Sequence, residues 1–172
     1  MTLQYSGLHE EPGALRTPFS DTGFEPVNLI DILRYRAGHQ SGQRAYTFLA
    51  DGQGTGSYIK YGELDRRARG VAARLQTLGV TSGERVLLLY PPGLEYVAAF
   101  LGCLYAGVVA VPAYPPRLNR PIDRLRGIAA DSKAAVALTT TDILSTLERR
   151  LAHAPEMKRM PARPPFAVFV VS

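Results

Sequence analysis

Cysteine and histidine are scarce in this sequence, and their scarcity limits the kinds of site that it can build. The 172 residues include a single cysteine, Cys103, so no disulfide can form within the chain. The three histidines fall in the N-terminal stretch and at two expected helix ends, and no Cys or His cluster has the spacing of zinc ligands. A disulfide scaffold and a structural zinc module are therefore excluded.

Common catalytic motifs are also missing. The sequence has no Gly-Lys-Ser/Thr phosphate loop, no Gly-x-Ser-x-Gly element and no metal-binding dyad. Gly52, Gly54 and Gly56 resemble a phosphate-cradling loop, but they connect two strand patterns, which favours a flexible hairpin turn. Asp21-Thr22-Gly23 matches the aspartic-protease tripeptide, yet it occurs once and follows no apolar strand, which indicates a turn. We expect no catalytic and no metal-ligating residue in this chain.

Targeting and membrane segments are not evident. Residues 1–6 lack both a basic segment and an apolar core, so we expect no secretory signal and a cytoplasmic location. Residues 96–116 carry no charge and are long enough to cross a bilayer. Because glycines and prolines interrupt this stretch, we interpret it as a helix followed by a strand, with no membrane span.

The charge is basic but unevenly distributed. Twenty Lys and Arg face fifteen Asp and Glu, whereas residues 1–27 alone carry one arginine against four acids. A basic balance raises nucleic-acid binding as a hypothesis. However, the arginines of residues 63–74 alternate with Glu63 and Asp65 on the polar side of one amphipathic segment, which is typical of a solvated helix face. We therefore expect no nucleic-acid partner.

Apolar periodicity predicts strands alternating with helices. Helical patterns begin after Asn28, at 62, after Pro91-Pro92-Gly93, at 119 and at the expected cap Thr141. Apolar runs typical of buried strands occupy 86–90, 108–111, 134–138 and 166–171. Residues 44–50 and 57–61 read as the two arms of a hairpin. The fold class is α/β, a parallel-type sheet with helices on both faces plus an N-terminal β-hairpin.

A run of arginines follows the apolar strand 108–111, at its carboxyl end and before a helix. Its members are Arg117, Arg120, Arg124 and Arg126, relieved only by Asp123. Ligands of doubly wound sheets bind outside the carboxyl ends of strands, and helix N-termini favour anions. Arg117 and Arg120 are therefore candidates to face a phosphate group. The alternative is a solvated helix face without a ligand.

Three stretches together resemble a known family. Tyr61-Gly62-Glu63-Leu64 opening an Arg- and Ala-rich helix, and the strand and helix of residues 86–95, resemble conserved elements of the adenylate-forming enzymes, the acyl- and aminoacyl-activating superfamily. Residues 101–117 end in Ala-Tyr-Pro-Pro-Arg, which is similar to the fatty acyl-AMP ligase branch rather than to acyl-CoA ligases. The resemblance covers the chain from about Leu29 to about Met157.

The resemblance implies a two-step activation by the complete enzyme. A fatty acid carboxylate attacks the α-phosphate of ATP, and the acyl group of the resulting adenylate passes to the phosphopantetheine thiol of an acyl carrier protein. Such chemistry implies ATP and Mg²⁺. The lysine-containing phosphate loop, the acidic metal ligand and the mobile C-terminal domain of the family have no counterpart in these residues.

We thus interpret the chain as the N-terminal part of a fatty acyl-AMP ligase, inactive alone. Three segments are expected: an irregular leader over 1–27, the N-terminal part of the ligase domain over 28–157, and a divergent tail over 158–172 that indicates truncation or a shifted reading frame. Alternatives are a piece of a long-chain acyl-CoA ligase, a module that binds phosphorylated ligands through the arginine run, and a nonfunctional remnant.

Overall fold

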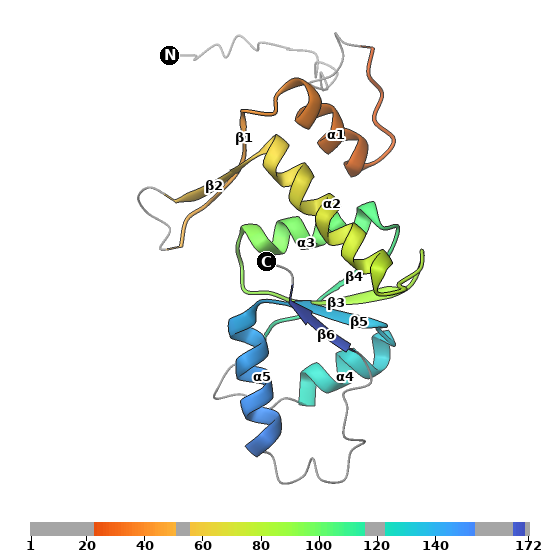
Figure 1. The fold of residues 1–172 in the computed structure, drawn as a ribbon, viewed down its shortest axis with the longest axis vertical. Coiled ribbons are helices and arrows are strands. Elements are labelled where there is room, and N and C mark those ends of the chain that lie inside the picture. Colours follow the sequence, from red (N-terminus) through yellow and green to blue (C-terminus); the bar gives the residue numbers. More distant parts are fainter. Residues whose placement is uncertain (1–22, 51–55, 116–122, 154–166, 171–172) are drawn as a thin grey trace, which may run out of the picture.

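The fold joins a parallel sheet to an N-terminal hairpin through stacked helices (Figure 1). The computed structural model describes residues 23–50, 56–115, 123–153 and 167–170. Its elements in chain order are α1 (Leu29–His39), β1 (Arg44–Phe48), β2 (Ser57–Lys60), α2 (Tyr61–Thr77), β3 (Arg85–Leu89), α3 (Leu94–Tyr105), β4 (Val109–Pro112), α4 (Asp123–Ser132), β5 (Val136–Thr139), α5 (Thr141–His153) and β6 (Ala167–Val170).

The four sheet strands lie in the order β4-β3-β5-β6, and every neighbouring pair is parallel. Side chains alternate between the two faces of a strand, so one strand serves two cores. Val86 and Leu88 of β3 pack on the face that α2 and α3 cover, whereas Leu87 and Leu89 pack toward α4 and α5. Figure 1 shows these two helix pairs on opposite sides of the sheet. The predicted α/β class is therefore confirmed.

A second, smaller core holds the hairpin and α1 against α2 and α3. Strands β1 and β2 pair antiparallel, as predicted for residues 44–61. Ile59 of β2 is 1% exposed and packs with Leu33 of α1 and Leu64 of α2. A two-stranded hairpin has little stability of its own, so this apolar anchor is what fixes it to the helices.

Helix ends follow the sequence signals in most places. The Asn28 side chain accepts hydrogen bonds from the backbone N–H groups of Ile30 (2.8 Å) and Asp31 (3.0 Å), which caps α1 as predicted. At α5, however, the predicted cap Thr141 is wrong by one position. The Thr140 hydroxyl accepts from the Ile143 N–H at 3.4 Å, and Thr141 is already the first helical residue.

The uncharged stretch 96–116 divides as predicted into α3, a turn at Gly107 and β4. No described helix combines the length and apolar character that a bilayer span requires. One expectation for this stretch holds only in part, because β4 is an edge strand of the described sheet rather than a buried one. Val109 is 49% exposed, since β4 pairs with β3 alone among the described strands.

Candidate functional site

The sheet has a topological switch point between β3 and β5. The chain passes from β3 to β4 on one side and then crosses to β5 and β6 on the other. The connections that leave β3 and β5 consequently run to helices on opposite faces, α3 and α5. A crevice opens at the carboxyl ends of two such strands, and α/β proteins bind their ligands there. The topology therefore indicates this edge of the sheet as the candidate site.

A hydrogen bond joins the residues that end β3 and β5 at this edge. The hydroxyl of Thr139, which is fully buried, donates a 2.8 Å hydrogen bond to the backbone oxygen of Leu89. The bond joins residues 50 positions apart in the sequence and holds the two strand ends together. Thr140 follows as the cap of α5. These hydrogen bonds hold the ends of β3 and β5 and the start of α5 in place at this edge of the sheet.

Tyr90, the residue after β3, carries an unsatisfied polar group. It is 5% exposed, and its buried hydroxyl finds no hydrogen-bond partner in the described part of the chain. Burial raises the pKa of this hydroxyl well above its ordinary value, and Cys103 and Glu95 add to the rise. A buried hydroxyl without a partner has lost its hydration without replacement. It marks a place where a polar group from outside the described residues would be stabilised.

Cys103 lies close to Tyr90 in the same core, between the sheet and α3. It is fully buried, and burial raises the pKa of its thiol to about 12. The thiol is therefore protonated at neutral pH and is no nucleophile. This agrees with the expectation that Cys103 behaves as a small apolar residue.

The predicted phosphate-facing residues, Arg117 and Arg120, lie outside the described residues, so their role stays a prediction. Arg124 of α4 is exposed. Within the described ranges, no group of three His, Cys, Asp or Glu side chains could hold a metal ion. The switch point can therefore position polar groups, but the residues described there supply neither a base nor a nucleophile.

A polar cluster at the junction of α1, α2 and α3 was missed by sequence reasoning. The Tyr105 hydroxyl donates a hydrogen bond to Asp65 Oδ1, and Arg69 forms an ion pair with Asp65 Oδ2 at 2.5 Å. Asp65 is 5% exposed, so its assignment to a solvated helix face is wrong. Burial, followed by the hydrogen bond to Asp65, raises the pKa of the Tyr105 hydroxyl. The signal that could have suggested burial is the spacing of Asp65 to Ala68 and Ala72, three and seven positions later on the buried side of α2.

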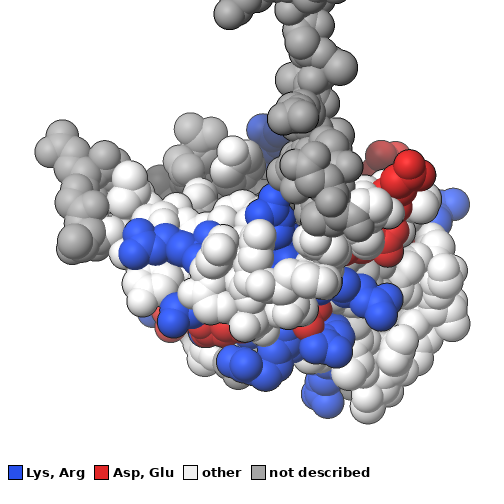
Figure 2. Space-filling view, turned by 90° about the horizontal axis from the view of Figure 1, so that it is seen from above, with Lys and Arg blue, Asp and Glu red and all other residues white. Residues whose placement is uncertain are grey.

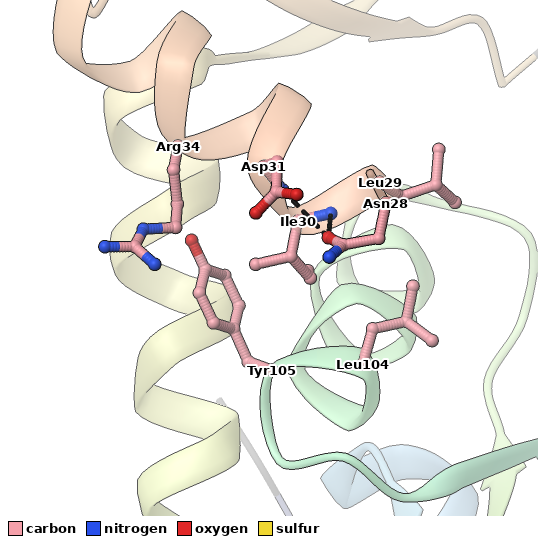
Figure 3. Close-up of a pocket in the computed structure, with 7 residues that line it drawn as sticks. All are labelled: Asn28, Leu29, Ile30, Asp31, Arg34, Leu104 and Tyr105. Carbon is pink, nitrogen blue, oxygen red and sulfur yellow. Dashed lines mark hydrogen bonds between the residues drawn. The ribbon is translucent and has the colours of Figure 1, made fainter. Parts of the chain in front are cut away.

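A pocket of about 570 Å³ opens beside this cluster (Figure 3). Apolar side chains of α1 and α3 and the charged Asp31 and Arg34 form its wall together with Tyr105. In Figure 3 the Arg34 guanidinium and the Tyr105 hydroxyl lie near each other. The pocket lining comes from the start of α1 and the end of α3, and no residue at the ends of β3 or β5 contributes, so it is separate from the switch point.

Comparison with known proteins decides the family. The family model described as "AMP-binding enzyme" matches residues 33–165. The chain belongs to the AMP-binding enzyme family. The match includes every described element from β1 to α5.

Several relatives of this chain are named as fatty-acid ligases. The chain is 47% identical over 136 residues to the medium-chain-fatty-acid–[acyl-carrier-protein] ligase JamA of Moorena producens, covering 77% of this chain and 23% of that protein. A fatty acyl-adenylate ligase from Legionella pneumophila, solved with acyl adenylate and pyrophosphate, is 34% identical with a TM-score of 0.68, covering 83% of this chain and 23% of that one.

A benzoate CoA ligase from Burkholderia xenovorans is also similar, at 27% identity and a TM-score of 0.62. The match covers 86% of this chain and 26% of that ligase. The chain therefore spans about a quarter of the length of these members of the AMP-binding family. The resemblance inferred from residues 61–64, 86–95 and 101–117 is confirmed.

Proposed function

We propose that this chain forms the N-terminal part of a fatty acyl-AMP ligase. The complete enzyme would join a fatty acid carboxylate to the α-phosphate of ATP, release pyrophosphate and pass the acyl group to the thiol of an acyl carrier protein. The observation that carries the proposal is the 47% identity with JamA, whose name gives both the acid and the carrier protein. The likeness to the Legionella ligase supports the adenylate step.

Within that enzyme the chain would act as a scaffold. Cys103 and Tyr90, the buried titratable groups in the core between the sheet and α3, are protonated at neutral pH, and burial raises the pKa of both further. Use of ATP follows from the family. The described residues do not fit a Mg²⁺ site, since they offer no cluster of three candidate ligands. The cytoplasmic location expected from the sequence stays a prediction.

Arg117 and Arg120 are proposed to face the phosphates of the nucleotide. In support, β4 ends at Pro112 on the same edge of the sheet as β3 and β5, because the three strands are parallel. A chain that binds phosphate through these two side chains loses affinity for it when both become glutamine. Unchanged binding of ATP by the double variant in calorimetry would refute this role.

An acyl-CoA ligase is the second candidate, and the 27% identity with the benzoate CoA ligase is the observation in its favour. The two candidates predict that residues 33–165 of this chain will function in different host enzymes. We would graft these residues into the Legionella fatty acyl-adenylate ligase and, separately, into the benzoate CoA ligase. Each graft is compared with its unmodified host by trapping the adenylate with hydroxylamine.

The proposal expects the graft in the fatty acyl-adenylate ligase to retain adenylate formation, while the graft in the CoA ligase loses most of it. The reverse result would favour the CoA ligase. Alone, the 172-residue chain is expected to form no acyl hydroxamate above a blank without enzyme. Activity of the isolated chain would contradict its assignment as a scaffold.

A further inference from the structure

The hydroxyl of Tyr90 is a buried polar group that the described part of the chain leaves without a hydrogen-bond partner. Tyr90 follows β3 directly and is 5% exposed, and its side chain lies in the core between the sheet and helices α2 and α3. The other buried members of this core are aliphatic residues and Cys103. Buried polar atoms in folded proteins nearly always have a partner, so this hydroxyl calls for an explanation.

The electrostatics around this hydroxyl determine which kind of partner fits it. Burial, Cys103 and the Glu95 carboxylate raise the pKa of the Tyr90 hydroxyl, in that order, so it keeps its proton and can donate. Glu95 is exposed at the start of α3, and its negative charge disfavours a second anion beside it. The fitting partner is therefore a neutral oxygen acceptor, such as the carbonyl of a peptide bond, rather than a carboxylate or a phosphate.

Aromatic side chains at the boundary of the same core are incompletely covered. Tyr96 and Phe100 of α3 and Phe169 of β6 pack against the buried residues but stay partly exposed. The rings of Tyr96 and Phe100 stack with their centroids 6.2 Å apart. We call these three residues the aromatic rim. Aromatic residues are enriched where one protein segment packs on another, because they combine a large apolar area with few rotatable bonds.

The rest of the ligase is the occupant that the comparisons provide. The chain spans 23% of JamA and 23% of the Legionella ligase, so most of such an enzyme lies outside these residues. On the α1 side of the molecule charge gives no competing surface, since in Figure 2 Lys and Arg form several separate patches with Asp and Glu among them. A segment that covers an apolar core needs apolar side chains, and its main-chain carbonyls need donors once water is excluded.

We propose that an apolar segment from the remainder of the complete ligase packs on the aromatic rim and that one of its main-chain carbonyl oxygens accepts a hydrogen bond from the Tyr90 hydroxyl. The inference rests on the proposed function, which supplies that remainder. The oxygen of Tyr90 is covered in this chain, so the side chains over it must turn aside as the segment packs. One buried hydrogen bond within an apolar contact fixes the register of the segment, because any other register leaves both groups unpaired. Tyr90 is thus a positioning residue that acts through the segment it holds.

The first test measures urea unfolding of the 172-residue chain with and without Tyr90→Phe. The variant removes only the unpartnered oxygen, so the urea midpoint should rise by about 0.5 M. The matched control is Tyr105→Phe, which removes the same atom from a hydroxyl that donates to Asp65 within the chain. The midpoint of the control should fall, since Asp65 then loses a buried hydrogen bond. An unchanged or lower midpoint in Tyr90→Phe would overturn the inference.

The second test places the two substitutions in the Legionella graft described above, which carries Tyr90, Tyr96 and Phe100, while the host supplies the rest of the enzyme. In the graft the Tyr90 hydroxyl has its carbonyl partner, so Tyr90→Phe should lower the urea midpoint by roughly 0.3 M instead of raising it. Tyr105→Phe should lower the midpoint in both proteins. A rise with Tyr90→Phe in both proteins would show that its oxygen stays unpartnered in the complete enzyme, which contradicts the interface.

A bound substrate is the competing occupant, and it is tested on the 172-residue chain. ATP and a medium-chain fatty acid are added separately to the unmodified chain and to Tyr90→Phe. The interface predicts that neither compound changes the difference between the two urea midpoints. If one of them raises the midpoint of the unmodified chain alone, that compound is the partner of the hydroxyl and the inference fails.

The inference and the proposed function can fail separately. Unfolding of the graft reports on the Tyr90 contact whether or not the graft is active, whereas the hydroxylamine assay reports on adenylate formation alone. A graft that unfolds cooperatively without forming adenylate contradicts the proposed function, and the sign of the Tyr90→Phe shift still decides the interface. A graft that forms adenylate but shows no reversal of sign contradicts the interface alone.

Discussion

Each buried polar side chain for which the structure shows a partner ties two elements together. Asp65 joins α2 to α3 through Tyr105, and Thr139 joins β5 to β3 through the Leu89 carbonyl. Local sequence patterns could not reveal either contact, because the partners are 40 and 50 positions away. The helical period assigned Asp65 to solvent on polarity alone, and its burial depends on a tyrosine contributed by another helix.

At the same scale, Cys103 should resist thiol reagents in the native chain. It is fully buried and its thiol pKa is raised to about 12, so both access and thiolate are lacking at pH 8. We expect modification by a chromogenic disulfide reagent to be about a hundredfold slower than in urea-unfolded chain, following the fraction of open molecules. Equal rates with and without urea would contradict the burial of this residue.

The raised pKa of Cys103 also predicts a dependence of stability on pH. The ordinary thiol value is 9.0 and the folded value about 12, so the unfolded chain releases this proton first. The contribution is complete below about pH 9 and is lost as the pH rises toward 12. Urea unfolding of the unmodified chain and of Cys103→Ala at successive pH values checks the sign. The variant should show the shallower decline above pH 9.

At the scale of elements, the periodic signals located every described helix and strand, while contacts set the details. The stripe of Leu64, Ala68 and Val71 packs inward as predicted. The exposed position of β4 could not be read from its apolar run, because a sequence run reports hydrophobicity and not the number of neighbouring strands. The switch point was equally hidden, since strand order depends on pairing between segments far apart in the chain.

The crossing of α2 and α3 depends on a glycine. A Cβ at Gly102 would lie 2.5 Å from the Val71 Cβ and 2.9 Å from the Ala68 oxygen, which is too close without movement of the helices. We expect Gly102→Ala to lower the free energy of unfolding by about 1–3 kcal/mol, as overpacking does. The measurement is urea denaturation followed by circular dichroism.

Gly70 supplies the matched control on the facing helix. A Cβ there would meet nothing within 4 Å, so Gly70→Ala gains helix propensity without a clash. The free energy of unfolding should rise by about 0.5–1 kcal/mol. If both alanine variants shift the free energy of unfolding in the same direction, the result contradicts the close approach of α2 and α3 at Gly102.

At the scale of the whole molecule, the C-terminal strand is part of the sheet. Strand β6 pairs with β5 over four positions, Phe169 packs against the core, and Arg74 lies 5.8 Å from the centre of its ring. The predicted origin of residues 158–172 in a truncation or frame shift is untested, and reading the downstream DNA in all frames would test it. Whatever the origin of this segment, its described residues 167–170 contribute pairing and burial.

A chain ending at His153 should therefore be less stable than the full chain. Removal of β6 exposes one edge of β5 and uncovers apolar core surface, which favours association between chains. We expect a lower urea midpoint, and in size-exclusion chromatography a larger share of oligomers. An unchanged midpoint would show that β6 adds nothing to the fold.

The order of the strands also bears on how the chain folds during synthesis. Strand β3 leaves the ribosome before either strand that it pairs with, and its bond to β5 waits for fifty more residues. The hairpin core, by contrast, draws only on residues up to Tyr105. Low sequence separation favours early formation. We expect the nascent chain to assemble this core first and to use it as a platform, while the future centre of the sheet stays open until β5 emerges.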